Sequence, residues 1–371
     1  MRYLPLLFAV VVSAWGQTGP HVQFSHTTEN LRGVSAVSRQ VAWASGSHGT
    51  FLRTTDGGLT WVPAQVPEAG TLDFRGVAAF SADEAFLMSA GPAEQSRIYY
   101  TNDAGKHWQL QFTNTNPKGF FDSMAFWDSK HGVVLGDPIP DDTGKLKFEV
   151  LLTEDGQNWR PVSPARLPVA LEGEGAFAAS NSCLAILRGG SDANIWFATG
   201  GKTARIFHSG DRGQTWQASE TPIIHGADSA GIFSIAFRDP IHGVIVGGDY
   251  KRPNDDGPNL AFTVDGGKTW TLPPLSPLAY FSAVAYDLRV NQAAIQEASA
   301  PANQKKVLVH PVAPERMFIV GTDFVFDLRP PNNPRRIGGK KRLGFHFNAV
   351  SAYPEGGALV VGPNGAMAVI P

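Results

Sequence analysis

The sequence predicts an all-β fold, a β-propeller of seven four-stranded antiparallel blades. Composition favours many short strands joined by tight turns, because the 371 residues include 40 Gly and 27 Pro and 43% of them are hydrophobic. One turn motif recurs at about the length of a four-stranded blade. A spare strand near the N-terminus matches one missing at the C-terminus, which predicts a ring closed by strands from both ends.

The recurring motif is centred on Asp and ends in Trp. Its full form is Ser/Thr-x-Asp-x-Gly-x-Thr-Trp, as in Thr54–Trp61, while the copy at Thr153–Trp159 is one residue shorter. The five motif aspartates, separated by 47, 52, 56 and 54 residues, are Asp56, Asp103, Asp155, Asp211 and Asp265. That period suits one propeller blade with loops of varying length.

Each residue type of the motif has a structural reason to be there. A short Asp side chain accepts hydrogen bonds from the backbone of its own turn, and Gly permits the positive φ that such a turn needs. The Trp offers a large apolar face to a neighbouring blade. We therefore interpret the five aspartates as structural residues rather than as ligands or catalysts.

This pattern resembles the Asp box of BNR-repeat propellers, a superfamily that includes sialidases, sortilin-type receptors and photosystem II assembly factors. The resemblance in architecture covers the chain from residue 17 to 371, and the style is closest to that of the assembly factors. It implies radially stacked blades, with ligands usually bound on the face opposite the Asp boxes. The box is shared by proteins of many roles, so the resemblance fixes the fold rather than the function.

Two predicted blades lack the motif. The sixth is read from 281–285, 317–321 and 324–328, and the seventh from 347–350, 358–361 and 367–370. The last blade is one strand short, and residues 21–25 supply it. Six or eight blades is the alternative if the sixth is misread. Residues 287–316, rich in Ala, Gln and Pro, are expected to form a loop insertion in the sixth blade.

The N-terminal residues 1–16 read as a signal peptide. A basic start at Arg2 precedes a short apolar run, and Ala14-Trp15-Gly16 places small residues before a cut at Gln17. The run is too short to span a bilayer, and an uncleaved anchor is the alternative. We therefore expect a secreted or periplasmic protein with no membrane span after cleavage.

Charge and cysteine content narrow the choice of partners. With 31 Lys and Arg against 33 Asp and Glu, no overall field favours nucleic acid. The single cysteine, Cys183, allows no intramolecular disulfide and is expected to be a buried hydrophobe. The sequence shows no phosphate loop, metal-ligand cluster or Ser-His-Asp order, so we expect no cofactor and no metal. The expected partner of a monomeric chain is a protein, a carbohydrate or a small anionic ligand.

Acidic loops supply one set of candidate site residues. The loops 136–144 and 248–257 interrupt equivalent positions of two blades, and Glu174 lies in the connection between them. Convergent carboxylates from Asp137, Glu174 and Asp249 would bind a cation, accept sugar hydroxyls or act as an acid/base pair. The alternative, which we favour, is that they are solvated, turn-forming residues. Tyr250 and Lys251 of the second loop are further candidates for ligand binding.

The inner strands supply a second set of candidates. In each blade a polar residue follows the leading apolar position and is expected at the mouth of the central channel; these residues are Arg32, Arg75, Asp122, Ser234, Ser282 and Asn348. With Arg205, the arginines would clamp a carboxylate as they do in sialidases. Against sialidase activity, the chain has no Arg-Ile-Pro motif, and no nucleophilic Tyr with its Glu can be placed.

Two functions follow from these residues. The first is a non-catalytic extracytoplasmic binding or assembly scaffold that uses the face opposite the Asp boxes. The second is a glycoside hydrolase or lyase that acts through the rim carboxylates. Two carboxyls about 5 Å or about 6.5–9.5 Å apart across a pocket would favour hydrolysis, whereas a filled or flat channel mouth would favour the scaffold.

Overall fold

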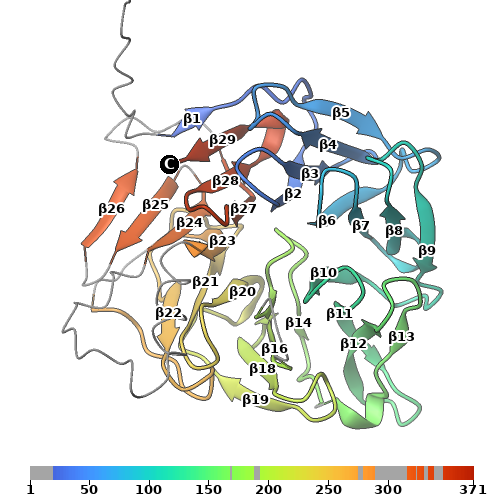
Figure 1. Cartoon of the computed structure of the whole chain (residues 1–371). Coiled ribbons are helices and arrows are strands. Elements are labelled where there is room, and N and C mark those ends of the chain that lie inside the picture. The colour runs from blue at the N-terminus through green and yellow to red at the C-terminus, as the bar shows by residue number, and fades with distance from the viewer. Residues whose placement is uncertain are drawn as a thin grey trace, which may run out of the picture.

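A computed structural model describes residues 20–167, 169–187, 193–274, 279–288, 316–322, 324–329, 333–337 and 346–371. Its strands form twisted antiparallel sheets arranged around a central axis, which is the arrangement of a β-propeller (Figure 1). The expected signal peptide, residues 1–16, and most of the expected insertion at 287–316 lie outside the described residues. Within the described part, no helix is long and apolar enough to cross a membrane.

The sheets follow one another around the ring, and most strands do so in chain order; the exceptions are β1, β14 and β17. The first three blades are β2 (Leu31–Ala36), β3 (Ala42–Gly46), β4 (Thr50–Thr54) and β5 (Val62–Gln65); β6 (Asp73–Ala79), β7 (Ala85–Ala90), β8 (Arg97–Thr101) and β9 (Gln109–Thr113); and β10 (Phe121–Phe126), β11 (Gly132–Pro140), β12 (Leu146–Thr153) and β13 (Arg160–Pro161). The next two sheets are β15 (Leu184–Ile186), β16 (Ile195–Ala198), β18 (Arg205–Ser209) and β19 (Gln217–Glu220); and β14 (Glu174–Gly175), β17 (Gly200–Gly201), β20 (Ala227–Phe237), β21 (Gly243–Asp249) and β22 (Leu260–Thr263). The last two are β23 (Phe281–Tyr286), β24 (Met317–Gly321), β25 (Phe324–Arg329) and β26 (Asn333–Ile337); and β27 (Ala349–Ala352), β28 (Ala358–Val361), β29 (Met367–Ile370) and β1 (His21–Val22). Short 3₁₀ turns lie at η1 (Ala93–Gln95), η2 (Pro164–Arg166) and η3 (Pro363–Gly365).

The prediction of seven four-stranded blades is wrong, because the described strands form six such blades. The remaining sheet has five strands in the order β14-β17-β20-β21-β22. Its inner strand β20 is 11 residues long, and its first residues pair with β17, which pairs in turn with β14. On the outer side, only an isolated bridge between Phe262 and Thr271 follows β22. This sheet therefore extends toward the axis instead of ending in a regular outer strand.

Glycine makes the inward extension of this sheet possible. Gly200 in β17 pairs with Gly231 in β20, and a Cβ on Gly200 would lie 2.9 Å from the Gly231 Cα. Gly231 adopts φ 150°, a conformation that side chains rarely allow. The two backbones therefore approach more closely than any pair with side chains would.

The two ends of the chain meet in one sheet. His21 pairs with Val369 and Val22 with Ala368, so β1 becomes the outer strand next to β29. Gln23 then ties this strand to the first blade: its amide donates to the Gly57 carbonyl at 3.0 Å and accepts from the Trp61 indole at 2.9 Å. The pairing covers the edge that β29 would otherwise expose.

The five Asp-centred motifs form turns with nearly the same hydrogen bonds. In the first, the Thr54 hydroxyl donates to Asp56 at 2.8 Å, and Asp56 also accepts from the Thr60 amide at 2.9 Å. The matching carboxylate-to-amide bonds at Asp103, Asp155, Asp211 and Asp265 measure between 2.7 and 3.0 Å. Each aspartate thus has its acceptor capacity engaged by its own turn.

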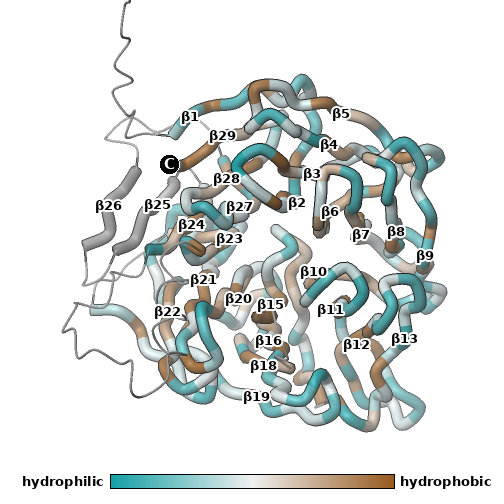
Figure 2. The backbone as a smooth tube through the Cα atoms, viewed as in Figure 1, coloured by the Kyte–Doolittle hydropathy of each residue, from teal (hydrophilic) through white to brown (hydrophobic). Residues whose placement is uncertain are grey.

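The core is divided into apolar clusters between neighbouring sheets. The motif tryptophans belong to it: Trp61 packs with Tyr353 and Leu359 of the last blade, and Trp159 packs with Phe86 of the blade before it. Apolar residues accordingly follow the strands, and hydrophilic ones gather in the loops (Figure 2). Blade-to-blade packing of large aromatic faces holds the ring together.

Candidate functional site: an axial pocket

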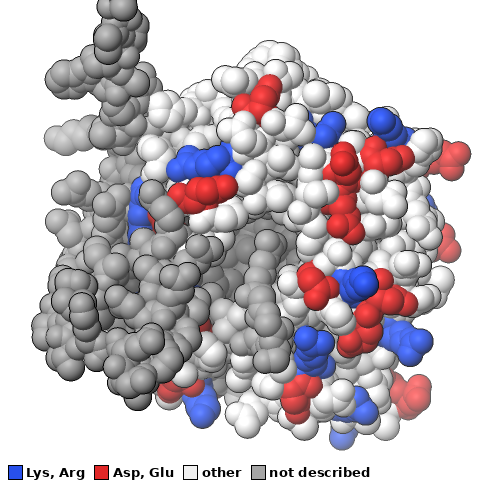
Figure 3. All heavy atoms as spheres, viewed as in Figure 1, with Lys and Arg blue, Asp and Glu red and all other residues white. Residues whose placement is uncertain are grey.

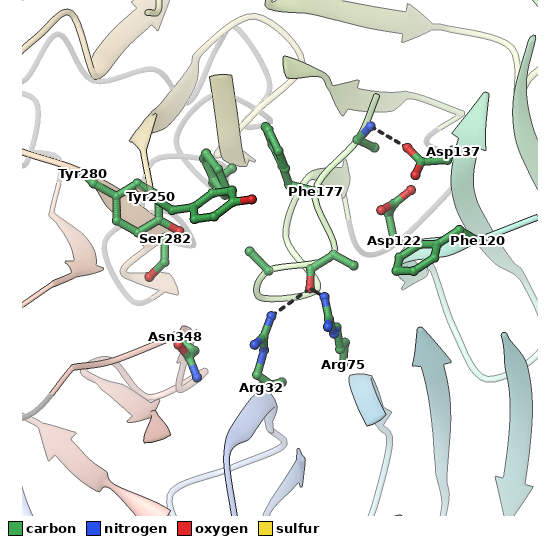
Figure 4. A pocket seen from close by; sticks show the side chains of 14 residues that line it. Arg32, Arg75, Phe120, Asp122, Asp137, Phe177, Tyr250, Tyr280, Ser282 and Asn348 are labelled. Atoms are coloured by element: carbon green, nitrogen blue, oxygen red, sulfur yellow. Dashed lines mark hydrogen bonds between the residues drawn. The ribbon is translucent and has the colours of Figure 1, made fainter. Parts of the chain in front are cut away.

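A pocket of about 470 Å³ lies on the axis, where the inner strands approach one another. It is lined by Arg32, Arg75, Phe120, Asp122, Asp137, Ala176, Phe177, Ala178, Ala179, Phe233, Tyr250, Tyr280, Ser282 and Asn348. The lining combines guanidinium groups, carboxyl groups and aromatic rings from several sheets (Figure 4). On the face drawn in Figure 3, acidic and basic side chains are interspersed over the described blades.

A bulge in the inner strands aims the polar side chains into the pocket. The pairing register with the second strand shifts between Leu31 and Gly33, and the residue left out of the pairing is Arg32. The same shift leaves out Arg75 in β6, Asp122 in β10 and Ser282 in β23. An extra residue in one strand breaks the ladder locally and redirects its side chain. The position after the leading apolar residue is therefore a bulge that faces the axis.

In β20 the bulge falls one residue earlier than the sequence reading placed it. The register shifts between Ile232 and Ser234, so Phe233 is the bulged residue and lines the pocket. Ser234 is buried outside the lining, where its hydroxyl oxygen accepts the Val284 amide at 3.0 Å. Asn348 does line the pocket, and its amide donates to Asn30 at 2.8 Å and to the Leu31 carbonyl at 2.7 Å.

Residues 176–179 cross the axis and form one wall of the pocket. The guanidiniums of Arg32 and Arg75 both donate to the Ala178 carbonyl, at 3.2 and 3.0 Å (Figure 4). Phe177 stacks on Phe233 with the ring centroids 4.0 Å apart and the planes 8° from parallel. This segment therefore joins the basic side of the pocket to its aromatic side.

The two arginines differ in their charge partners. Arg75 donates from Nε to Asp73 at 2.8 Å. For Arg32, no carboxylate lies within ion-pair distance among the described residues, and its buried Nε has no hydrogen-bond partner there. Burial and the neighbouring Arg75 lower the pKa of Arg32 below its usual value. Arg32 therefore brings a desolvated positive charge to the pocket wall, which a buried anion would stabilise.

A buried carboxyl lines the same pocket as the arginines. Asp122 is 1% exposed, and its Oδ2 is buried without a hydrogen-bond partner among the described residues. Burial, followed by the charge of Asp137, raises the pKa of Asp122 well above its usual range, against the opposing charge of Arg75. Burial also raises the pKa of Asp137, whose Oδ1 accepts the Ala176 amide at 3.0 Å. Burial therefore favours the protonated form of Asp122, and a protonated carboxyl can donate a hydrogen bond.

Glu174 and Arg205 bind each other instead of facing the pocket. The Arg205 Nε donates to Glu174 Oε1 at 3.0 Å, and its Nη2 donates to Oε2. Glu174 also accepts the Thr199 hydroxyl at 2.7 Å and the Leu171 amide at 2.8 Å. With a side chain of 0% exposure and every acceptor engaged, Glu174 braces β14 against β18.

The loop after β21 sends one residue to the pocket. Asp249 accepts Arg252 Nε at 2.9 Å and the Lys251 amide at 3.0 Å, and neither Asp249 nor Lys251 is part of the lining. Tyr250 does line the pocket and is 49% exposed, so part of its ring faces solvent. The three rim carboxylates Asp137, Glu174 and Asp249 therefore do not converge on one pocket.

The sequence analysis named several polar residues of the pocket and Tyr250, and missed the other aromatic residues of the lining. Those found in the lining are Arg32, Arg75, Asp122, Asp137, Tyr250, Ser282 and Asn348. Phe120 and Tyr280 were missed, although each directly precedes the Phe that starts an inner strand, Phe121 and Phe281. That repeated aromatic pair is the signal that would have found them.

No protein-family model and no curated protein matches the chain. Solved structures do match it over nearly its full length. YCF48 bound to D1 peptide is 14% identical with a TM-score of 0.61, covering 96% of this chain and 98% of that one. YCF48 from Cyanidioschyzon merolae is 15% identical (TM-score 0.58, covering 95% and 98%), and a streptogramin B lyase is 9% identical (TM-score 0.59, covering 95% and 99%). These similarities establish the β-propeller fold.

Proposed function

We propose that this protein is a non-catalytic, extracytoplasmic binding scaffold whose axial pocket receives a carboxylate group of a protein partner. The observation that carries the proposal is the convergence of Arg32 and Arg75 on a single backbone carbonyl in the pocket. A neutral carbonyl is a weaker acceptor than a carboxylate, which forms shorter, charge-assisted hydrogen bonds with guanidinium groups. The pocket is therefore complementary to a negative group that the described residues do not supply to Arg32.

The resemblance in fold agrees with a scaffold role. YCF48 is a propeller solved with a D1 peptide bound, and it covers almost the whole of this chain. The Asp-centred turns support membership of the Asp-box propellers, among which photosystem II assembly factors are the branch of closest style. The signal-peptide pattern at residues 1–16 supports an extracytoplasmic location.

Binding of defined peptides tests the proposal. The probes are fluorescein-labelled 12-residue peptides with several Asp and Glu residues, compared with the same sequences carrying Asn and Gln. We expect the acidic peptides to bind the mature chain, and Arg32→Met or Arg75→Met to weaken binding by about 10- to 100-fold, as loss of a charge-assisted hydrogen bond predicts. Arg160→Met, on the exposed outer strand β13, is the matched control and should bind like the wild type. Equal binding of acidic and neutral peptides, or no loss in the Arg32 variant, would overturn the proposal.

Glycoside hydrolysis or lysis is the second candidate, and one observation favours it. Asp122 and Asp137 line the same pocket and burial raises the pKa of both, and paired carboxyls with displaced pKa values serve acid/base catalysis. Catalytic roles for Glu174 and Asp249 are not supported by the geometry, since these carboxylates form ion pairs with Arg205 and Arg252. Turnover of any member of a chromogenic glycoside panel by the wild type, abolished in Asp137→Asn, would replace the scaffold proposal with this one.

A further inference from the structure

We propose that the axial pocket binds a small acid in which the carboxylate is attached to an aromatic ring by a short linker, with the carboxylate on Arg32 and Arg75 and the ring on the aromatic wall formed by Phe177, Phe233 and Tyr280. The inference rests on the proposed function in taking this pocket as the binding site. It adds the chemical class of the ligand. Three features of the lining carry it, namely the arginine donors that remain available to a ligand, the aromatic rings and the buried carboxyl of Asp122.

The arginines retain hydrogen-bond donors for a ligand. Each guanidinium has five N–H groups, and one from each is directed to the Ala178 carbonyl. The Nε of Arg32 is buried without a partner among the described residues. A carboxylate that bridges the two guanidiniums would therefore gain two or more charge-assisted bonds without displacing residues 176–179. It would also neutralise the charge that Arg32 carries.

The pocket lining is rich in aromatic rings. Phe120, Phe177, Phe233, Tyr250 and Tyr280 make up five of the 14 lining residues. Tyr280 meets Phe233 edge to face at 4.9 Å, and Tyr250 does so at 6.1 Å. Edge-to-face and offset-stacked contacts favour a flat aromatic partner over an aliphatic one of equal size. The half-exposed Tyr250 is placed to cover such a ring as it enters.

The size of the pocket suits a small molecule. Its volume of about 470 Å³ lies within the range of about 300–1,000 Å³ typical of ligand sites. Figure 4 shows the arginines and the rings of Phe177 and Tyr250 bordering the same space. Convergent polar groups combined with aromatic side chains are typical of ligand sites.

Asp122 makes the affinity of this site for an anion depend on pH. Around it stand Asp137 of β11, Arg75 of β6, Glu149 of β12 and the Cys183 thiol next to β15. While protonated, Asp122 donates a hydrogen bond and adds no negative charge to the pocket. Once the pH rises through its elevated pKa, its carboxylate would repel the bound anion. Affinity for the acid should therefore fall as the pH rises, and Asp122→Asn should remove most of that dependence.

Calorimetric titration with 3-phenylpropanoate tests the inference. We expect this acid to bind, and its amide, acetate and 3-cyclohexylpropanoate each to bind at least 10-fold more weakly. Arg32→Met and Tyr250→Ala should both weaken binding of the acid, while Arg160→Met should leave its binding unchanged. Tyr250 is exposed enough that its truncation leaves folding intact, which circular dichroism checks. Equal affinity for acid and amide, or for phenyl and cyclohexyl compounds, would refute the proposed ligand class.

A second set of titrations shows whether the ligand is a free small acid or the end of a partner chain, and separates failure of this inference from failure of the scaffold proposal. Peptides that end in Phe are titrated with a free or an amidated terminal carboxyl, in competition with 3-phenylpropanoate. Tighter binding of the free-carboxyl peptide than of the small acid would assign the same chemistry to the end of a partner chain. If acidic peptides bind through Arg32 while neither aromatic probe binds, the scaffold proposal stands and this inference fails. If acidic peptides also fail to bind, both are wrong.

Discussion

The buried pair of Glu174 and Arg205 offers the sharpest test of which carboxylates are structural. In Arg205→Met, Glu174 keeps its Thr199 and Leu171 bonds but loses the only cation that the described residues place against it. Its side chain is 0% exposed, so its charge has no access to solvent. Breaking a buried pair by removing one partner costs about 3–5 kcal/mol, most of it for the charge left behind. At an m-value of about 3 kcal/mol per M, the urea midpoint should fall by about 1 M or more.

A double variant shows whether the unpaired charge of Glu174 causes the loss of stability in Arg205→Met. Glu174→Gln combined with Arg205→Met keeps an amide oxygen for the Leu171 N–H and removes both charges. It should recover more than half of the lost stability, because neutral replacements of buried pairs are often tolerated. Urea unfolding followed by tryptophan fluorescence measures all four members of the cycle. If the double variant is as unstable as Arg205→Met, the charge argument is wrong, and packing of the Arg205 side chain on Phe207 accounts for the loss instead.

Three further predictions concern pH and ring closure. The pKa of Asp122 is higher in the folded state than in the unfolded state, so its contribution to stability is present below the unfolded-state pKa and is lost as the pH rises through the folded-state pKa. Asp122→Asn should remove that decline, which urea midpoints measured at a series of pH values would show. The pKa of Asp265 is lowered to about 2 against the competing effect of burial, by its bonds to Thr269 and other groups of its turn. The contribution of Asp265 to stability is therefore present above its unfolded-state pKa and is lost as the pH falls toward 2. The difference in stability between wild type and Asp265→Asn should shrink over that pH range. Removing residues up to Phe24 deletes β1 and exposes the β29 edge; thermal unfolding and light scattering should show a lower Tm and more aggregation, and unchanged behaviour would contradict a role in closure.

The sequence predicted the repeating part of the molecule well because local chemistry determines it. An Asp-centred turn of eight residues satisfies its own hydrogen bonds, as at Asp56, and therefore forms wherever its residues occur. The inner-strand bulges repeat too, so the positions of Arg32, Arg75 and Asp122 on the axis follow from the first apolar residue of each strand. A sequence repeat predicts where residues lie only where each blade forms the same local structure.

The parts that could not be predicted depend on contacts between distant segments. In β20, Ile232 and Phe233 are adjacent and both apolar, so hydrophobicity alone does not show which one is paired and which one bulges; the register is set by pairing with β21. The five-stranded sheet requires Gly200 of β17 to pair with Gly231 of β20, a contact that no local pattern contains. Glu174 looked like a rim carboxylate for the same reason, since Arg205 lies 31 residues away along the chain.

The irregular sheet and the pocket have the same structural origin. An axis surrounded only by regular blades would leave a channel lined by the bulged residues, with Arg32 and Arg75 facing water. The inward extension of β20 and its pairing with β17 and β14 instead bring residues 176–179 across that channel, which supplies the Ala178 carbonyl and places Phe177 on Phe233. Burial then follows for Asp122 and Arg32, and burial is what displaces their pKa values. The departure from blade regularity therefore converts a channel into a partly open pocket, in which Arg32 and Arg75 would bind the proposed carboxylate.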